Sequence, residues 1–487
     1  MAPTAPTGPG LALMSPPEGV FIDVLDPADL RRVVGRVPAM SPAEVTTLYD
    51  AAAEGAARWR DTSPLERARV LAAGAANLRS RREDVAADLV AEMGKTRAEA
   101  TIEVEKSADF LDYYAGLARA PYGYLLVDSR PGTQTSVRTE PLGVVCLITP
   151  WNDPLLTPAR KIAPALATGN AVILKPATET PLVALRLEQA LREAGLPSGV
   201  FATVTGRVSE IEAALLDDPR LAAVSFTGSN AVGQRIKRRL ADRNVRLQTE
   251  MGGKNASVVL EDADVDLAVA TVAAAAFGQA GQRCTATSRV IVDRAVAGQV
   301  VDGLARAAAE VRLGPGAEPA TTMGPLVSAR HRADVLEHIG RARAQGAHVV
   351  TGGEAPSDEP LAHGCYVTPT VLTDVETTMD IWREEVFGPV VVVQVVDGFD
   401  AAVAATNDSA FGLAAAVFTT SLARAHAFAD RANTGQVSVN LPTSGWDVHM
   451  PFGGFGDSGS PFKEQGLEGP RFYTRVKTVA IRHGGAL

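Results

Sequence analysis

Residues 143–152 of the chain read Gly-Val-Val-Cys-Leu-Ile-Thr-Pro-Trp-Asn. The apolar part of this stretch, residues 143–148, is continuous and bounded by turn residues, which is typical of a buried strand in a parallel sheet. Similar runs follow at residues 171–174, 199–204 and 222–226, and the intervals between them leave room for crossover helices. This spacing predicts βαβ units and an α/β fold with a doubly wound sheet.

The chain on either side of these runs predicts further elements. Ser41-Pro42 and Ser63-Pro64 are N-cap and first-turn signals, so the segment up to about residue 116 is expected to be helical. Residues 123–138 are expected to form a hairpin arm and residues 472–478 an edge strand. A second α/β segment is expected in the C-terminal half, with strands at residues 256–260, 289–292 and 390–395.

Composition excludes several classes of function. The 487 residues are 46% hydrophobic and 21% charged, which predicts a soluble globular protein of two or three domains. The net charge of −9 does not favour nucleic acid or an anionic membrane as a partner. Three cysteines are too few for a disulfide framework or a zinc site, which fits a reducing, cytoplasmic setting.

The N-terminus gives no sign of export. Residues 2–6 read Ala-Pro-Thr-Ala-Pro, with no basic start and no apolar core, so they are expected to be a loose arm and not a secretory signal. The residues after Pro16 are expected to be a lead-in to the helices. No stretch approaches the roughly 20 apolar residues of a membrane span.

The residues that follow the strands are the candidates for ligand binding, because ligands of doubly wound sheets bind beyond the carboxyl ends of the strands. The first run is followed by Pro150-Trp151-Asn152, the second by Lys175-Pro176-Ala177-Thr178 and the fourth by Gly228-Ser229. The last pair stands at a helix start, where backbone N–H groups can hold a pyrophosphate. It lacks the Gly-x-Gly-x-x-Gly fingerprint, and a Gly-Ser pair after a strand is also an ordinary turn.

A candidate nucleophile lies in residues 277–285, Phe-Gly-Gln-Ala-Gly-Gln-Arg-Cys-Thr. Cysteine attacks carbonyl carbon only as the thiolate, so Cys284 needs help to lose its proton. Glu250 is a candidate for that help, since it precedes two glycines that let the backbone come close to a ligand. A single cysteine is also often a small buried hydrophobe, so the residue alone leaves both interpretations open.

Taken together and in this order, the motifs resemble the aldehyde dehydrogenase superfamily. The resemblance covers nearly the whole chain, from Pro150-Trp151-Asn152 to Pro451-Phe452-Gly453-Gly454, and the spacing of Glu250 and Cys284 matches as well. It implies a Rossmann-like cofactor domain, a doubly wound catalytic domain, an active-site and linker segment, and a β arm that pairs subunits into a homodimer or homotetramer. The expected bounds are 1–122 with 141–251, 252–439, 440–469, and 123–140 with 470–487, in that order.

The resemblance also implies roles for the residues. Cys284 would attack the aldehyde, Asn152 and the Cys284 N–H would hold the oxyanion, and Glu250 would activate water to release the acid. Lys175 belongs to the catalytic set and also to the cofactor site. The implied cofactor residues are Pro150, Trp151, Lys175, Ala177, Thr178, Gly228, Ser229, Gly252, Glu385 and Phe387.

Thr178 bears on the choice of cofactor. Family members strict for NAD often carry glutamate three residues after the lysine of the Lys-Pro motif, and here that position is threonine. A 2′-phosphate would meet no repelling carboxylate at this position. The cofactor is therefore expected to be NADP or NAD, with NADP favoured.

Arg160 bears on the substrate. Many relatives that act on apolar aldehydes carry tryptophan at this position. The arginine is similar to that of the 2-oxoglutarate and succinate semialdehyde dehydrogenases, where it binds the carboxylate of the substrate. Asp153 replaces a usual aromatic residue and makes the tunnel more polar. Arg160 could instead pair with Asp153 or with another acid. The residues expected to bind the small aldehyde are Arg160, Asp153, Arg283, Ser444 and Phe452.

Other functions remain as alternatives. A dehydrogenase for non-carboxylated aldehydes would share every motif except Arg160. A CoA-acylating enzyme would generally lack Glu250, and a non-catalytic binding protein would have lost Cys284, Glu250 or Asn152. No metal centre is expected, because the histidines are scattered along the chain.

Overall fold

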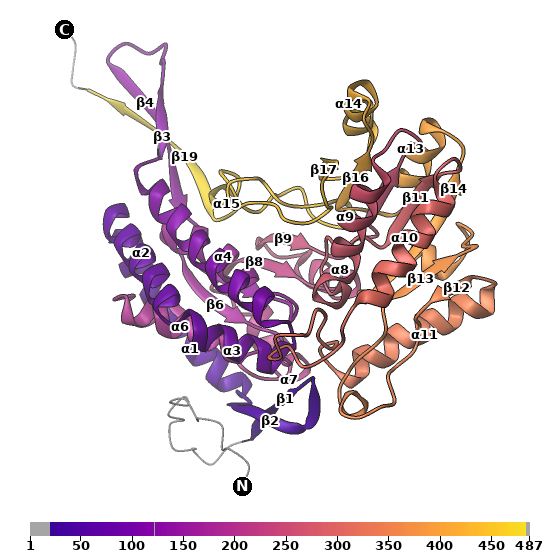
Figure 1. Ribbon diagram of the computed structural model, residues 1–487. Coiled ribbons are helices and arrows are strands. Elements are labelled where there is room, and N and C mark those ends of the chain that lie inside the picture. Colours follow the sequence, from indigo (N-terminus) through magenta and orange to yellow (C-terminus); the bar gives the residue numbers. More distant parts are fainter. Residues whose placement is uncertain (1–19, 121, 484–487) are drawn as a thin grey trace.

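The structure is a computed structural model that describes residues 20–120 and 122–483. The residues predicted to form a loose N-terminal arm, 2–6, lie outside this part of the chain. Figure 1 shows two bodies, each with a sheet and helices, and a narrow arm of strands that projects from one of them. This arrangement confirms the predicted α/β class with two doubly wound sheets and a small β arm.

The first sheet contains β5 (Val144–Ile148), β6 (Ala171–Lys175), β7 (Phe201–Thr203), β8 (Leu221–Thr227) and β9 (Arg246–Glu250). They are parallel, in the order β7-β6-β5-β8-β9, and include all four strands predicted in this region. The edge strand β9 was not predicted, because its sequence Arg-Leu-Gln-Thr-Glu has no apolar run. Its pairing with β8 makes it a strand.

Both faces of the first sheet are covered, because alternate residues of a strand point to opposite faces. Val145 and Leu147 enter one apolar core, whereas Val144 and Cys146 enter another. The predicted helix starts at Ser41 and Ser63 are confirmed, and each carries a complete capping box. The helices of this half are α1 (Pro42–Asp61), α2 (Pro64–Ser80), α3 (Arg82–Met93), α4 (Arg97–Gly116), α5 (Leu156–Ala167), α6 (Leu182–Glu193), α7 (Val208–Leu216) and α8 (Asn230–Leu240).

The second sheet contains β10 (Ala256–Val259), β11 (Arg289–Asp293), β12 (His348–Thr351), β13 (Thr370–Thr373), β14 (Val390–Val396), β16 (Ala414–Phe418) and β17 (Gln436–Val439). Its order is β12-β13-β14-β11-β10-β16-β17, and only the β12–β13 pair is antiparallel. The three predicted strands, β10, β11 and β14, are present. Of the four that were missed, three have only four residues, and β16 is alanine-rich, which gives it a low strand propensity.

Helices pack against the second sheet, and short elements connect it to the rest of the chain. The apolar run before Cys284 forms α9, which ends in a 3-10 turn, η2, next to that cysteine. The elements are α9 (Val265–Phe277), η2 (Gly278–Gly281), α10 (Ala297–Glu310), α11 (Ala329–Gln345), η3 (Leu361–His363), α12 (Asp380–Arg383), α13 (Phe399–Asn407), α14 (Leu422–Arg431), and the two-stranded pair β15 (Phe411–Gly412) and β18 (Phe455–Gly456).

The arm is a three-stranded antiparallel sheet of β3 (Gly123–Leu126), β4 (Thr133–Pro141) and β19 (Thr474–Arg482), in the order β19-β4-β3. It follows the turn η1 (Leu117–Arg119) on one side and the short helix α15 (Gly469–Phe472) on the other. The predicted hairpin is confirmed. The edge strand begins two residues later than predicted, because Phe472 belongs to α15.

A second hairpin was missed. The lead-in predicted after Pro16 contains β1 (Phe21–Asp26), paired antiparallel with β2 (Asp29–Pro38). Ile22 and Val24 are buried against Leu182 of α6. The alternation in Phe-Ile-Asp-Val-Leu-Asp is the signal that could have identified this strand.

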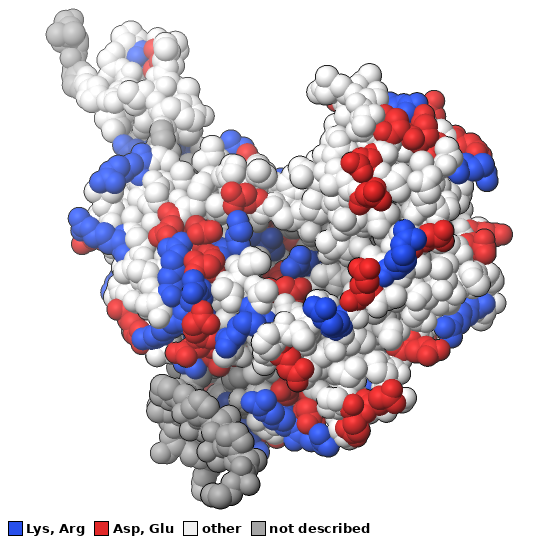
Figure 2. All heavy atoms as spheres, in the orientation of Figure 1, with Lys and Arg blue, Asp and Glu red and all other residues white. Residues whose placement is uncertain are grey.

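The ends of β5, β8 and β9 open onto a cavity that residues from both halves of the chain line. Figure 2 shows a hollow in this face of the molecule, with acidic and basic side chains interspersed around it. In the part of the chain that the structure describes, no helix has both the length and the apolar character needed to cross a membrane.

Candidate active site

A cavity of about 530 Å³ contains most of the predicted site residues. Four of them do not line it: Glu250, Lys175, Ala177 and Thr178. The predicted residues that do line it are Pro150, Trp151, Asn152, Asp153, Arg160, Gly228, Ser229, Gly252, Arg283, Cys284, Glu385, Phe387, Ser444 and Phe452. The tertiary structure therefore brings together segments that are up to about 300 positions apart in the chain.

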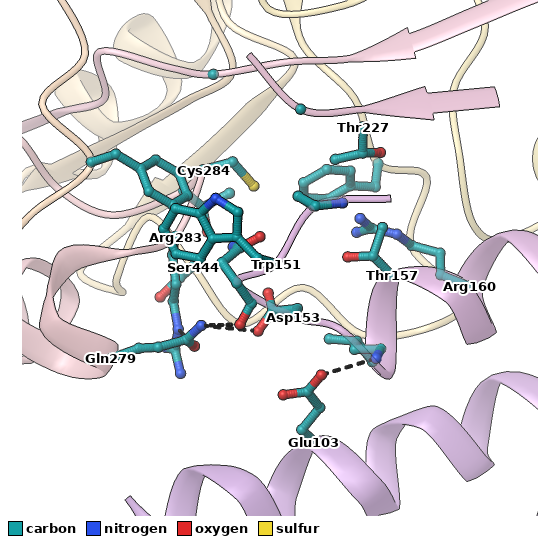
Figure 3. A pocket seen from close by; sticks show the side chains of 18 of the residues that line it. Glu103, Trp151, Asp153, Thr157, Arg160, Thr227, Gln279, Arg283, Cys284 and Ser444 are labelled. Atoms are coloured by element: carbon teal, nitrogen blue, oxygen red, sulfur yellow. Dashed lines mark hydrogen bonds between the residues drawn. The ribbon is translucent and has the colours of Figure 1, made fainter. Parts of the chain in front are cut away.

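Cys284 presents its sulfur to the cavity (Figure 3). It is a free thiol that follows the left-handed turn η2. Burial raises the pKa of the Cys284 thiol to about 12, and the positive charge of Arg160 opposes this rise. The thiol is therefore protonated at neutral pH, and its attack on a substrate requires a base.

Asn152 follows β5 and is buried beside Cys284. Its side-chain Nδ2 donates one hydrogen to the carbonyl of Gln282, at 2.9 Å, which ties it to the loop that carries the cysteine. An amide nitrogen has two hydrogens. No other acceptor for Nδ2 is found in the described part of the chain, so its second hydrogen can serve an oxyanion formed at Cys284.

Glu250 lies behind the cavity wall, at the end of β9. The residue is 2% exposed, and neither carboxylate oxygen has a hydrogen-bond partner among the described residues. A Cβ at Gly453 would lie 2.5 Å from Oε1 of Glu250, so the glycine leaves the room that this carboxylate occupies. Burial and the charge of Glu464 raise the pKa of Glu250 well above its usual range, and Lys161 opposes the shift.

Arg160 projects from α5 and is 8% exposed. Its Nε lies 2.9 Å from Oε2 of Glu464, and its guanidinium stacks over the ring of Phe452, 4.7 Å from the centroid. The pairing with an acid that was expected as an alternative is therefore present, with Glu464 and not with Asp153. Figure 3 shows the terminal nitrogens of Arg160 beside Thr157, directed into the cavity.

The second cavity arginine, Arg283, has a different environment. Its Nε donates to Oε1 of Gln279 at 2.8 Å, and no carboxylate lies within ion-pair distance of it among residues 20–120 and 122–483. Asp153 pairs instead with the buried ammonium of Lys95, at 3.1 Å. Lys95 also pairs with Glu103, which lines the cavity beside it.

Lys175 ends β6 and is buried outside the cavity wall. Its ammonium donates to the carbonyl of Pro176, and burial lowers the pKa of Lys175 to about 8, with the charge of Glu179 opposing the shift. An ammonium with a single hydrogen-bond partner has two donors left for ribose hydroxyls. Thr178 is half-buried nearby in the sequence, and Glu179 is exposed.

The backbone around Gly228 and Gly252 forms a cradle for a phosphate or a ribose. Ser229 is the N-cap of α8 but makes no capping bond, so the first N–H groups of the helix are available to an anion. A Cβ at Gly252 would lie 1.9 Å from Oε2 of Glu385, and Oε1 of Glu385 accepts a bond from the Gly253 N–H at 2.9 Å. The glycine is therefore required for this position of the Glu385 carboxylate.

An aromatic cluster completes this half of the cavity. The rings of Trp151 and Phe387 meet edge to face with centroids 5.3 Å apart, and the ring of His331 lies 5.1 Å from Trp151. Phe387 has the left-handed φ of 55°, and its carbonyl bonds to Nε2 of His331 at 2.8 Å. The cavity thus offers a helix N-terminus for a phosphate, the Glu385 carboxylate for ribose hydroxyls, and flat apolar walls for an aromatic ring. This combination fits a nicotinamide dinucleotide.

The Aldehyde dehydrogenase family model matches residues 15–479. The chain belongs to the aldehyde dehydrogenase family. It is 41% identical over 462 residues to an alpha-ketoglutarate semialdehyde dehydrogenase of Haloferax volcanii, with 95% of each chain covered. It is 36% identical over 462 residues to a 2,5-dioxopentanoate dehydrogenase of Saccharolobus solfataricus, with 94% of this chain and 95% of that one covered.

Solved structures agree. The betaine aldehyde dehydrogenase of Staphylococcus aureus in complex with NAD+ has a TM-score of 0.93 and 32% identity, with 96% of this chain and 92% of that one covered. These comparisons confirm the resemblance and the fold, and they identify the chain as an NAD(P)-dependent aldehyde dehydrogenase. Among the described residues, no group of three or more His, Cys, Asp or Glu side chains could hold a metal ion.

Several residues of this aldehyde dehydrogenase site were not found from the sequence. Gln279, Lys95 and His331 line the cavity, and Glu464 reaches both Arg160 and Lys161 from behind it. Gln279 stands inside the stretch that carries Cys284, so its position was the available signal. The sequence holds no comparable signal for Glu464 or Lys95, because the residues that they contact are distant in sequence.

Proposed function

We propose that this aldehyde dehydrogenase oxidises a semialdehyde, an aldehyde with a carboxylate at its far end, to the corresponding acid. The observation that carries the proposal is that two guanidinium groups, of Arg160 and Arg283, line the same cavity as the Cys284 sulfur. Arginine binds carboxylates through paired N–H groups. The semialdehyde and dioxo-acid names of the curated relatives support the same substrate class.

The ion pair of Arg160 with Glu464 does not remove it from substrate binding. The shortest contact of the pair is made by Nε, and neither Nη atom has a hydrogen-bond partner among the described residues. The stacking on Phe452 fixes the plane of the guanidinium. Arg160 therefore presents a preorganised edge to a carboxylate, and the proposal does not require it to leave Glu464.

The proposed chemistry begins with loss of the Cys284 thiol proton to solvent and attack of the resulting thiolate on the aldehyde carbon. The free hydrogen of the Asn152 amide and the Cys284 N–H stabilise the resulting oxyanion. A nicotinamide bound in the cavity would supply a hydride acceptor, and loss of the hydride would leave the acyl group on Cys284 as a thioester. Lys175 and Glu385 would hold the cofactor, and the walls of Trp151 and Phe387 would exclude water from the reacting part of it.

Glu250 then acts as general base on the water that hydrolyses the thioester. Its carboxylate lies behind the cavity wall, so this role requires the side chain to rotate toward Cys284. Because neither oxygen has a hydrogen-bond partner in the described chain, the rotation breaks no hydrogen bond. Burial and the charge of Glu464 raise the pKa of Glu250, which makes its carboxylate a stronger base toward water than an exposed glutamate. The presence of this base favours transfer of the acyl group to water over transfer to CoA.

We propose that the enzyme accepts NADP as well as NAD. Thr178 is half-buried and uncharged, which supports room for a 2′-phosphate, whereas Glu179 is exposed one residue further on. Thr178→Glu is expected to lower kcat/KM for NADP about tenfold relative to NAD, since a carboxylate repels the phosphate. Steady-state rates with both cofactors test this, and an unchanged ratio would place the 2′-phosphate elsewhere.

We further propose that the arm pairs subunits into a homodimer or homotetramer. Tyr124, Leu125 and Leu126 of β3 and Val476 of β19 are exposed apolar side chains on strands with a free edge, which is a surface that proteins usually cover. Light scattering of the full chain tests the proposal. A monomeric mass would contradict it.

We also propose a cytoplasmic location. Cys146, Cys284 and Cys365 are all free, and Cys146 and Cys365 are buried. Unpaired thiols persist in a reducing compartment. Cell fractionation followed by detection of the protein tests this location.

The substrate class is tested with two aldehydes of equal chain length, only one of which carries a terminal carboxylate. The carboxylated substrate is expected to have the higher kcat/KM by about tenfold or more, which is about 1.4 kcal/mol in the transition state. Arg160→Leu is expected to erase most of this lead. Arg160→Lys keeps a charge beside Glu464 and serves as the control for stability. Equal kcat/KM values for the two aldehydes in the wild type would contradict the proposal and favour a dehydrogenase for non-carboxylated aldehydes.

A further inference from the structure

Gln279 bonds to residues on two sides of the part of the cavity that Arg160 and Arg283 line, which we call the substrate half. Its side-chain Nε2 donates to the carbonyl of Asn152 at 2.6 Å and to Oδ1 of Asp153 at 3.2 Å. Its Oε1 accepts a bond from Nε of Arg283 at 2.8 Å. Figure 3 shows the amide of Gln279 reaching toward Asp153, and the residue is 3% exposed, so bulk water does not compete for these bonds.

The neighbours fix the orientation of this amide. Nε2 faces three oxygen acceptors, the third being the carbonyl of Gln282 at 3.5 Å, and Oε1 faces a cation. The flipped amide would place its oxygen against the oxygens of Asn152 and Asp153, and its N–H groups against the Arg283 guanidinium. The bonding pattern therefore permits one orientation.

The backbone also points to a specific role for this side chain. Gln279 and the next residue, Ala280, have left-handed φ angles of 53° and 55°. Glycine adopts such angles at little cost, whereas other residues are strained there, and strain of this kind gathers at functional sites. The Gln279 N–H also donates to the Glu99 carboxylate at 2.6 Å, which holds the turn in place.

Asp153 and Arg283 are opposite charges that share Gln279 without forming an ion pair with each other. Oδ1 of Asp153 accepts hydrogen bonds both from the Lys95 ammonium, at 3.1 Å, and from the Gln279 amide. Arg283 gives only its Nε to Gln279, so both Nη groups remain free toward the cavity among the described residues. The amide thus stands between a cation and an acid that would otherwise attract one another.

We propose that Gln279 is a positioning residue that sets substrate specificity, because it holds the Arg283 guanidinium apart from Asp153. In this position Arg283 keeps its charge and its two Nη groups available for the carboxylate of a semialdehyde. Without the amide, Arg283 turns onto Asp153 and is neutralised. The inference rests on the proposed function, in which the substrate carries a carboxylate.

The test is the ratio of kcat/KM for a carboxylated aldehyde to that for a neutral aldehyde of equal length. Gln279→Met keeps the volume and removes both polar groups, and it is expected to lower the ratio about tenfold. Effects on the oxyanion through Asn152 act on both aldehydes and cancel in the ratio. Adding Asp153→Asn to Gln279→Met removes the acid that captures Arg283, so the ratio is expected to return to within about threefold of the wild type.

Lys106→Met is the matched control. Lys106 also lines the cavity but pairs with the half-buried Asp447, and its loss is expected to change the ratio by less than about twofold. Where Gln279→Met fails to fold, as judged by thermal unfolding, Gln279→Glu replaces it. Its carboxylate neutralises Arg283 directly, so the same loss of ratio is expected.

The outcomes separate the two proposals. If the wild type shows no preference for the carboxylated aldehyde, the proposed function falls and the inference falls with it. If the wild type shows the preference and Gln279→Met or Gln279→Glu retains it, only the inference is overturned. A ratio that is lost in Gln279→Met and not restored by Asp153→Asn also overturns it, because the role would then not depend on separating the two charges.

Discussion

The two halves of the cavity are built from different materials. The half that we propose for the cofactor uses backbone and flat apolar surface: the start of α8 at Gly228-Ser229, the glycine at 252, and the rings of Trp151 and Phe387. The half that we propose for the substrate uses charged side chains, among them Arg160 and Arg283. A helix terminus and a glycine depend on local sequence, whereas a cluster of charges depends on what the fold brings together.

Cys284 lies where the two halves meet, and its loss tests both at once. Cys284→Ala is expected to lower dehydrogenase activity about 10³-fold or more, because no nucleophile remains for the aldehyde. The affinity for the dinucleotide is expected to stay close to that of the wild type. The quenching of tryptophan fluorescence measures this affinity. Substantial aldehyde oxidation by this variant would contradict the assignment of the nucleophile.

Glu250 separates acyl formation from acyl release. Glu250→Gln is expected to lower the steady-state rate about 10²-fold while leaving a rapid first turnover, since the amide cannot activate water. Stopped-flow absorbance of the reduced nicotinamide measures this burst. A loss of the burst together with the steady state would place Glu250 in the first step, as the base for Cys284.

The pH dependence of Cys284 alkylation measures how the charge of Arg160 in the substrate half changes the pKa of the thiol. Because the pKa of the thiol is raised to about 12, the thiolate fraction and the rate of iodoacetamide inactivation are expected to rise about tenfold per pH unit between about pH 7 and 9. Arg160→Leu removes the charge that lowers this pKa, so inactivation is expected to be slower at each pH. A rate independent of pH would indicate a thiolate already formed at neutral pH.

Gly252 tests the cofactor half. In Gly252→Ala the new methyl group meets Oε2 of Glu385, and the displaced carboxylate is expected to raise the KM for the dinucleotide about tenfold. Gly298→Ala is the matched control, because a Cβ there meets no atom within 4 Å and the residue lies in the first turn of α10. Equal cofactor KM values in both variants would show that Glu385 does not hold the cofactor.

Much of the fold could be predicted from local pattern. The apolar runs that contain β5, β6, β7, β8, β10, β11 and β14 could be recognised from the sequence alone, and the Ser-Pro pairs marked the starts of α1 and α2. The strand β9 is polar and β16 is alanine-rich, so both depend on neighbouring strands for their conformation. Sequence pattern does not contain that information.

The site divides along the same line. The sequence by itself determined the family, the strand ends that carry the proposed cofactor residues, and the identity of Cys284 as the candidate nucleophile, because these features are contiguous motifs. Only the tertiary structure decided that Arg160 pairs with Glu464, that Glu250 lies behind the cavity wall, and that Gln279 stands between Asp153 and Arg283. Each of these depends on distances between side chains from separate elements, which packing determines and local sequence does not.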